Sequence, residues 1–215
     1  MSACIFIATS NQGKLRDFEA AAAPYGLTIA TVPNFSALPT VVEDGLTFEA
    51  NTRKKAESYS GYAPDELVLA DDSGLEVDAL NGTPGVHSAR YAAVAPELSG
   101  TNTDDEANNR KLIRAIQAIP LDQRTGRFVC VIAAARNRKT LATFRGIAEG
   151  IILDHPRGCN GFGYDPLFYF PQIHKTFAEL SLEEKARYSH RGSAFRQFLE
   201  WRKSRIQAGV TELSG

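Results

Sequence analysis

Apolar segments and helical patterns alternate along the first part of the chain. Residues 3–8 form an almost continuous apolar run, typical of a strand buried on both faces. Apolar residues then recur at helical spacing over 14–22, and Pro24 ends the pattern. A second strand is predicted over 27–32 and a second helix over 48–59. The order strand, helix, strand, helix favours parallel pairing at the start of a sheet.

The next apolar run, Leu67-Val-Leu-Ala70, is followed at once by Asp71-Asp72-Ser73-Gly74. Four apolar residues bounded by turn-forming residues predict a buried strand that stops at Asp71. In open α/β sheets, ligands bind beyond the carboxyl ends of the strands. We therefore expect Asp71 and Asp72 at a sheet edge where chemistry takes place. An acidic turn that merely caps the following segment is the alternative.

A long antiparallel hairpin is predicted near the middle of the chain. Residues 128–134 give the strongest strand pattern, and 140–149 form its neighbour across a turn at 136–139. Before this hairpin, Thr103 can cap a helix that Pro120 ends.

Two helices are predicted near the C-terminus, after a short apolar run at 167–170. Ser181-Leu-Glu-Glu184 fits a capping box for the first helix. The second helix has an apolar face made of Phe195, Phe198, Leu199 and Ile206. Because no repeat or linker interrupts the pattern, we expect residues 1–215 to form a single domain. The predicted architecture is mixed α/β, with a central sheet flanked by helices and two lobes around a cleft.

The overall charge is balanced, with 24 Lys and Arg against 25 Asp and Glu. A formal net charge of −1 argues against nucleic-acid or membrane partners. The three cysteines show no Cys-x-x-Cys spacing, which argues against a disulfide framework or a thiolate zinc site. No apolar run approaches the roughly 20 residues that span a bilayer, so we expect a cytoplasmic protein.

Three polar segments at predicted strand ends and helix starts carry candidate chemistry. Thr9-Ser-Asn-Gln-Gly-Lys14 offers hydroxyls, backbone N–H groups and one ammonium to a phosphate, although it lacks P-loop spacing. Gly161-Phe-Gly-Tyr-Asp-Pro166 combines glycines, stacking aromatics and an acid, which suggests a nucleobase pocket. Lys185 and Ser189-His-Arg-Gly192 add cations suited to a phosphate or a base carbonyl. A capped helix start, a packed turn and solvated surface charges are the respective alternatives.

Four carboxylates, on Glu43, Asp44, Asp71 and Asp72, could hold a hard cation such as Mg²⁺. Surface acids are commoner than metal ligands, so the alternative for Asp44 in particular is a surface carboxylate without a function. Taken together, the polar clusters predict a Mg²⁺–nucleotide site in a cleft.

The chain resembles the inosine triphosphate pyrophosphatase-like enzymes, which hydrolyse non-standard purine nucleoside triphosphates to the monophosphate and pyrophosphate. The resemblance runs nearly end to end and rests on six ordered blocks. These are Ala8-Thr-Ser-Asn-Gln-Gly-Lys14, Glu43-Asp-Gly-Leu-Thr-Phe48, Ala70-Asp-Asp-Ser-Gly-Leu75, Pro84-Gly-Val-His-Ser-Ala-Arg-Tyr91, Gly161-Phe-Gly-Tyr-Asp-Pro166 and Ser189-His-Arg-Gly192.

The resemblance implies a role for each matching residue. Glu43 and Asp72 would bind Mg²⁺, and Asp72 would also orient or deprotonate the attacking water. Asp71 would be a structural or supporting carboxylate. The substrate-binding residues would be Thr9, Ser10, Asn11, Gln12, Gly13 and Lys14 for the triphosphate, Ser73, then Phe162, Gly163, Tyr164 and Asp165 around the base, with Lys185, His190 and Arg191. The substrates would be ITP, dITP and XTP, and the family is usually homodimeric.

Two positions depart from the family pattern. Ser10 stands where relatives often have glycine, which adds a hydroxyl to the phosphate loop. Ala50 stands where relatives commonly carry glutamate, and Glu49 is displaced by one position, so we do not include it in the site.

Water attack on the α-phosphate, with cations offsetting the developing charge, is the predicted mechanism. An ordinary aspartate, with a pKa near 4, is a poor base at neutral pH, while burial beside another acid would raise that pKa and bound Mg²⁺ would lower it. A pyrophosphatase for modified pyrimidine or methylated guanine triphosphates and a non-catalytic nucleotide-binding protein are the alternatives.

Overall fold

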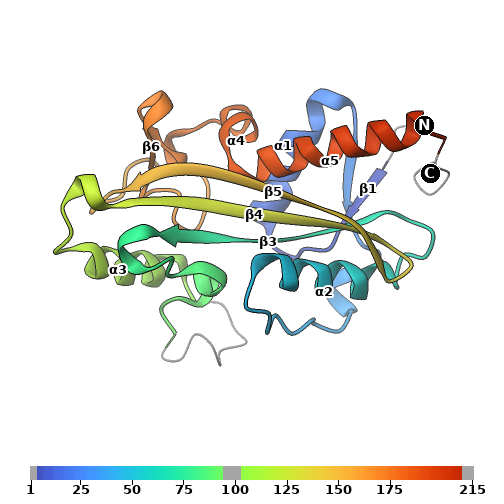
Figure 1. Cartoon of the computed structure of the whole chain (residues 1–215), viewed down its shortest axis with the longest axis horizontal. Helices are drawn as coiled ribbons and strands as arrows, with labels where there is room; N and C mark the ends of the chain where they lie inside the picture. The colour runs from blue at the N-terminus through green and yellow to red at the C-terminus, as the bar shows by residue number, and fades with distance from the viewer. Residues whose placement is uncertain (1–3, 94–102, 210–215) are drawn as a thin grey trace.

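The computed structural model describes residues 4–93 and 103–209. Seven strands form one mixed sheet in the order β2-β1-β3-β4-β5-β6-β7 (Figure 1). β1 is parallel to both β2 and β3, and the later pairs are antiparallel. The strands are β1 (Cys4–Ile7), β2 (Thr28–Thr31), β3 (Val68–Val77), β4 (Thr125–Arg136), β5 (Lys139–Ile152), β6 (Phe168–Phe170) and β7 (Lys175–Thr176). The predicted mixed sheet and its central hairpin are confirmed.

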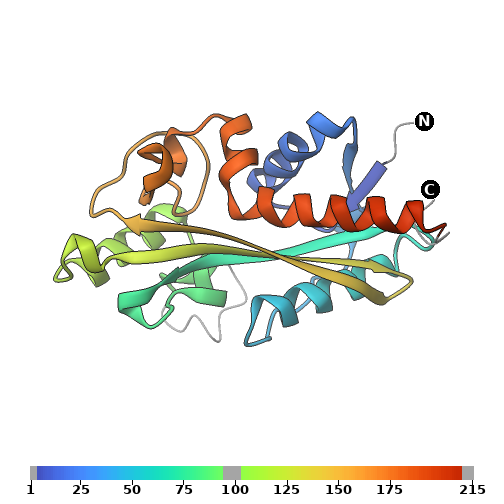
Figure 2. The same cartoon turned by 45° about the horizontal axis from the view of Figure 1, so that its top comes forward.

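Helices cover both faces of the sheet. In Figures 1 and 2, α1 and α5 lie on one face and α2 lies on the other. The α-helices are α1 (Gln12–Ala22), α2 (Phe48–Ser60), α3 (Asp105–Ile116), α4 (Leu182–Tyr188) and α5 (His190–Gln207). The 3₁₀ helices are η1 (Ala23–Tyr25), η2 (Phe35–Ala37), η3 (Asp78–Leu80), η4 (Gly85–Arg90), η5 (Leu121–Gln123), η6 (Pro171–Ile173) and η7 (Phe177–Glu179).

Burial on both faces explains why the strand sequences are so apolar. On the face of α1 and α5, Leu69 of β3 and Ile5 and Ile7 of β1 pack with Phe18 and Phe195. On the face of α2, Val68 and Ala70 pack with Ala56 and Tyr59. The result is a three-layered lobe in which successive residues of a strand enter different cores.

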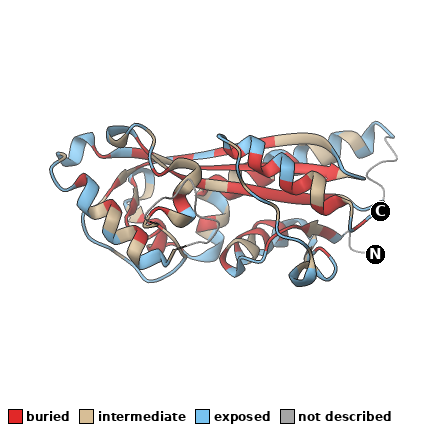
Figure 3. Cartoon of the chain, turned by 90° about the horizontal axis from the view of Figure 1, so that it is seen from below, coloured by how far each residue is buried: buried red, intermediate tan, exposed pale blue. Residues whose placement is uncertain are grey.

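A second lobe lies at the other end of the same long strands. Leu75, Val77 and Phe128 pack there with Leu112 of α3 and Phe177 of η7. Figure 3 shows buried residues along most of the strands that link the two lobes. β3, β4 and β5 therefore belong to both lobes.

The prediction that the strand stops at Asp71 is wrong. β3 runs without interruption from Val68 to Val77, and all ten of its residues pair with β4. The ladder to β4 satisfies the backbone groups of Asp71-Asp72-Ser73-Gly74, so their turn preference is overridden by tertiary pairing. The strand that does end here is β1, whose residues Phe6 and Ile7 pair with Val68 and Leu69 of β3.

Two further details differ from the sequence prediction. Asp104, rather than Thr103, caps α3, because its carboxylate accepts a hydrogen bond from the Ala107 N–H. Ile206 is 46% exposed and contributes nothing to the apolar face of α5, whereas Phe195 and Phe198 are buried. The capping box at Ser181 is confirmed. In the described part of the chain, no helix is long and apolar enough to cross a membrane.

Candidate active site

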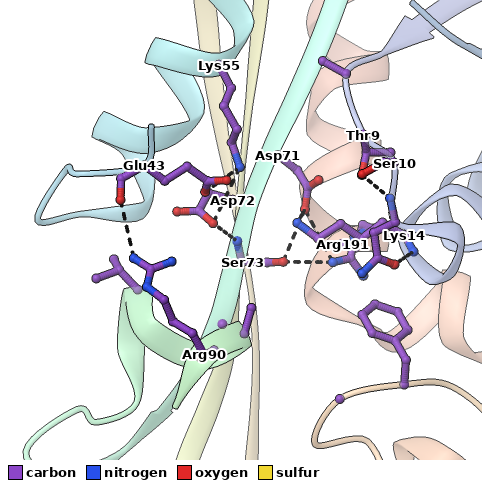
Figure 4. A pocket seen from close by; sticks show the side chains of 18 of the residues that line it. Thr9, Ser10, Lys14, Glu43, Lys55, Asp71, Asp72, Ser73, Arg90 and Arg191 are labelled. Carbon is purple, nitrogen blue, oxygen red and sulfur yellow. Dashed lines mark hydrogen bonds and ion pairs between the residues drawn. The ribbon is translucent and has the colours of Figure 1, made fainter. Parts of the chain in front are cut away.

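The two adjacent aspartates of β3 point to opposite faces of the sheet. Because side chains alternate along a strand, Asp71 faces α1 and α5 while Asp72 faces α2. Figure 4 shows the two carboxylates diverging from the strand, with Ser73 between their networks. The same dipeptide therefore contributes to two different electrostatic environments.

Asp71 lies in a buried ion-pair network. Its Oδ2 is 2.9 Å from the Lys14 Nζ and 3.5 Å from a terminal nitrogen of Arg191. Arg191 also donates to the Ser73 hydroxyl at 2.9 Å and to Asp17 of α1 at 2.6 Å. Burial alone would raise the pKa of Asp71, but the surrounding cations outweigh it and hold that pKa well below the ordinary value. Asp71 is thus a permanent anion that organises two cations.

Asp72 lies in an environment that raises its pKa instead of lowering it. Its Oδ2 accepts a hydrogen bond from the Asn51 amide at 3.1 Å, and its Oδ1 lies 3.8 Å from the Lys55 Nζ. Burial raises the pKa of Asp72, and nearby Glu43 raises it further, against the opposing effect of Lys55. A carboxylate with a raised pKa is a better proton acceptor than an ordinary aspartate.

The loop after β1 brings the phosphate-binding candidates beside Asp71. The Asn11 side chain caps α1 by accepting from the Lys14 N–H at 3.0 Å, and Thr9 accepts from the Asn11 N–H at 3.2 Å. These bonds turn the chain at the carboxyl end of β1, where Lys14 reaches over β3. A helix start at this place presents backbone N–H groups and an ammonium to an anion.

An aromatic loop forms the wall next to the phosphate-binding loop. The Phe162 ring lies 4.7 Å from the Lys185 Nζ and 5.6 Å from the Arg191 guanidinium carbon. Gly13 is required beneath this ring, because a Cβ there would lie 2.4 Å from a Phe162 ring carbon. Asp165 accepts from the Phe162 N–H at 2.9 Å and from Lys185 at 2.6 Å. The loop and the cations are therefore held together.

His190 and Tyr164 are buried more deeply than the sequence suggests. The imidazole of His190 stacks on Phe128 with 4.7 Å between ring centroids. Burial, together with the Arg191 and Lys185 cations, lowers the pKa of His190 well below its ordinary value, so the ring is neutral at pH 7. The Tyr164 hydroxyl donates to the Ser88 carbonyl at 2.8 Å. Both side chains therefore combine packing with a place at the cavity.

These elements surround a cavity of about 540 Å³, a volume typical of small-molecule sites. The sequence-predicted residues that line it are Thr9, Ser10, Asn11, Lys14, Glu43, Asp71, Asp72, Ser73, Phe162, Gly163, Tyr164, Asp165, Lys185, His190 and Arg191. Gln12 and Gly13 do not line it: Gln12 is exposed, and Gly13 packs under Phe162.

Sequence reasoning missed several residues at the cavity. Lys55, Ser88, Arg90 and Asp105 line it, and buried Asp17 lies behind Arg191 and Lys185. A signal for Lys55 was present, because Asn51 and Lys55 lie one turn apart on the same face of α2 as buried Phe48 and Ala56. Polar residues inside a buried helical stripe indicate a site.

Glu43 and Asp72 are the candidate metal ligands that face each other. The Lys55 Nζ lies 2.9 Å from Glu43 and 3.8 Å from Asp72, so the pair already holds one cation. Asp44 pairs with Lys54 and Glu49 with Arg53 at exposed positions. Among residues 4–93 and 103–209, no group of three or more His, Cys, Asp or Glu side chains gathers as a metal site.

The sequence is similar to known proteins over most of its length. The model of the Ham1 family matches residues 5–201. A dITP/XTP pyrophosphatase of Acidobacterium capsulatum is 47% identical, with 93% of this chain and 98% of that protein aligned. One from Geobacter sulfurreducens is also 47% identical, over 88% and 92% of the two chains.

Solved structures agree with these sequence matches. The Ham1 protein of Staphylococcus aureus superposes with a TM-score of 0.76 at 40% identity, covering 94% of this chain and 98% of that one. A HAM1 protein from Coxiella burnetii gives a TM-score of 0.76 at 38% identity, over 91% and 96%. The family resemblance drawn from the six sequence blocks is confirmed: the chain belongs to the Ham1 family.

Proposed function

We propose that this protein hydrolyses non-standard purine nucleoside triphosphates, namely dITP, ITP and XTP, to the nucleoside monophosphate and pyrophosphate. The observation that carries the proposal is the split of Asp71 and Asp72 between two faces of β3. One carboxylate organises Lys14 and Arg191, which suit an anionic substrate, and the other keeps a raised pKa beside Glu43. The relatives from Acidobacterium capsulatum and Geobacter sulfurreducens are dITP/XTP pyrophosphatases, which supports the same reaction.

Mg²⁺ is the proposed cofactor, and the residues present fit it. Glu43 and Asp72 converge on one point of the cavity, which Lys55 now reaches. Two carboxylates suit Mg²⁺, because this ion commonly takes one or two protein carboxylates and completes its octahedron with water and substrate phosphates. When bound, Mg²⁺ would neutralise phosphate charge and activate water.

Each side chain then has a distinct task in the proposed reaction. Asp72 orients the attacking water and accepts its proton as the bond to the α-phosphorus forms and the bond to the pyrophosphate oxygen breaks. Lys14 and Arg191 offset the negative charge that develops on the phosphate oxygens. Asp71 holds both cations in position through its Oδ2.

Selection of the base rests on hydrogen-bond donors at the aromatic wall. The Lys185 ammonium lies over the Phe162 ring and presents only N–H donors. Donors match the 6-oxo group of hypoxanthine or xanthine and leave the 6-amino group of adenine without an acceptor. A mismatch of this kind is strongly disfavoured because buried donors are left unpaired.

The test of the function is a substrate panel. We expect kcat/KM for dITP, ITP and XTP to exceed that for dATP by at least about 100-fold, given one mismatched polar contact in a desolvated site. Coupled detection of pyrophosphate measures each rate with Mg²⁺ present. Equal values across the panel would contradict the proposed selectivity.

Two further outcomes test catalysis and the metal. Tight nucleotide binding without pyrophosphate release would indicate the non-catalytic alternative. Activity that survives chelation of divalent cations would contradict the Mg²⁺ proposal.

The pH dependence of kcat/KM should report Asp72. Activity requires the ionised carboxylate, so it falls as the pH falls through the raised pKa of Asp72. Lys55→Gln removes a cation that lowers this pKa and should move the acidic limb to higher pH. Glu43→Gln removes an anion that raises it and should move the limb to lower pH. Lys54→Gln, which changes only an exposed pair with Asp44, is the matched control. Shifts of the same sign in both variants would contradict the assignment.

We also propose that the protein is a homodimer. Leu46 is 93% exposed at the edge of a hollow of about 580 Å³ whose lining includes Val86 and Val131. A protruding apolar side chain beside a hollow gives the self-complementary patch that a two-fold interface needs. Sedimentation equilibrium that finds only the 23.4 kDa monomer would contradict this.

A reducing compartment, the cytoplasm, is the proposed location. Its support is that Cys4, Cys130 and Cys159 are all free thiols. Fractionation that finds the protein outside the cytoplasm would contradict it.

A further inference from the structure

Helix α3 grips one residue of the aromatic loop from both sides. The Asp105 carboxylate accepts a hydrogen bond from the Gly163 N–H at 2.7 Å. The Asn109 amide donates to the Gly163 carbonyl at 2.9 Å. Asp105 and Asn109 are one helical turn apart, so their side chains project from the same face of α3. We call this pair the Gly163 clamp.

The clamp fixes the backbone where the loop changes direction. Gly163 has φ +60°, a left-handed conformation that glycine adopts without strain. Its N–H belongs to the peptide shared with Phe162, and its carbonyl belongs to the peptide shared with Tyr164. Holding both groups therefore fixes both peptide planes, and with them the placement of the Phe162 ring at the cavity wall.

Helix α3, which carries the clamp, is held in place by core packing and by side-chain hydrogen bonds. Leu112 and Ile116 of α3 are completely buried in the core of the second lobe. Asn108 accepts from the Ala92 N–H at 2.7 Å and from the Thr103 hydroxyl at 2.6 Å. The helix is thereby tied to Ala92, just beyond η4, and η4 carries Ser88 and Arg90 at the cavity wall.

From this geometry we propose that Asp105 and Asn109 are positioning residues for nucleobase binding. The clamp requires a hydrogen-bond acceptor at 105 and a donor at 109, and it holds Phe162 in place to stack on the base. This role rests on the proposed function, because it assumes that the aromatic wall receives a purine. Asp105 and Asn109 themselves hold the Gly163 backbone and not the phosphate-binding loop, which meets the clamped loop only where Gly13 and Arg191 contact the Phe162 ring. The clamp variants should therefore weaken the binding of pyrophosphate less than the binding of the base.

The test compares the two reaction products as separate probes. Calorimetry would measure the affinity of the wild-type protein and of variants for IMP, which carries the base, and for pyrophosphate, which does not. Asp105→Ala and Asn109→Ala should each weaken IMP binding about 5-fold, the effect of one lost hydrogen bond. Pyrophosphate affinity should fall by less than IMP affinity, because only the contacts of Gly13 and Arg191 with Phe162 link the phosphate side to the clamped loop. Glu106→Gln, an exposed neighbour that pairs with Arg110, is the control and should change neither.

Exchanging the two functional groups gives a sharper contrast. Asp105→Asn keeps an acceptor oxygen and should bind IMP as the wild type does, whereas Asn109→Asp replaces the donor with an anion facing a carbonyl and should weaken IMP binding by at least about 5-fold. Thermal unfolding of each variant separates a local change from a loss of the fold.

Unchanged IMP affinity in all folded clamp variants would overturn the clamp, and so would equal losses for IMP and pyrophosphate. A wild-type protein that hydrolyses no dITP would instead contradict the proposed function, so the two failures are distinguishable.

Discussion

Asp72→Asn is expected to lower kcat for dITP by about 1,000-fold at saturating Mg²⁺, within the range for the loss of a general base. The asparagine keeps the shape of the side chain and an acceptor for Asn51, but it can neither take a proton nor neutralise a metal ion. Steady-state release of pyrophosphate at pH 8 would measure the change. Turnover near the wild-type value would remove Asp72 from the chemistry.

The same substitution should leave the fold intact or make it more stable. The pKa of Asp72 is raised in the folded protein, so above that pKa the ionised carboxylate lowers the stability of the fold. Removing the charge removes this penalty. A thermal midpoint at or above that of the wild type would separate lost chemistry from lost structure.

Asp71→Asn, unlike Asp72→Asn, is expected to destabilise the fold and to reduce the free energy of unfolding by about 3 kcal/mol. The substitution leaves Arg191, whose exposure is only 2%, with Asp17 as its remaining buried anion and deprives Lys14 of its counter-ion. Unfolding in urea at pH 7 would measure the loss, with Asp72→Asn on the opposite face of β3 as the isosteric control. Equal midpoints for the two variants would contradict the different roles assigned to them.

The pH dependence of stability provides a second measurement on Asp71. Its pKa is lowered on folding, so its contribution is fully present above the unfolded value, near 4, and is lost as the pH falls toward the lower folded value. Wild-type protein should therefore lose stability between pH 5 and about 3 more steeply than Asp71→Asn does. Parallel curves would contradict this.

The elements were predictable from the sequence where local pattern and tertiary environment agree. In the hairpin, β4 carries a long buried run and β5 alternates buried and exposed residues, and a two-residue turn joins them at Asn137 and Arg138, which have positive φ. The reading of Asp71-Asp72-Ser73-Gly74 failed because its residues favour turns in isolation, while their partners on β4 are remote in sequence. Only the assembled sheet reveals that the segment is a strand.

The division of labour at the site was only partly predictable. The family resemblance singled out Asp72 for chemistry and left Asp71 as a structural or supporting carboxylate, whereas period-two alternation gives the physical reason, since neighbours on a strand face opposite ways. Asp17 and Asp105 could not be identified from local pattern, because each acts through a partner far along the chain, Arg191 and Gly163 respectively. Such contacts exist only once the two lobes have formed.

Because β3, β4 and β5 run through both lobes, the described residues 4–93 and 103–209 join the lobes by continuous paired strands rather than by a flexible linker. Any closure over a bound nucleotide must be taken up by a change of twist along three hydrogen-bonded strands, which spreads the deformation over many residues. Asp72 is paired within this ladder and stays fixed to the sheet. Lys14 of α1 lies on one face of β3, beside Asp71, and Lys55 of α2 lies on the other face, beside Asp72. The Asp72 carboxylate then keeps its position on the sheet, and the substrate moves toward it during any closure.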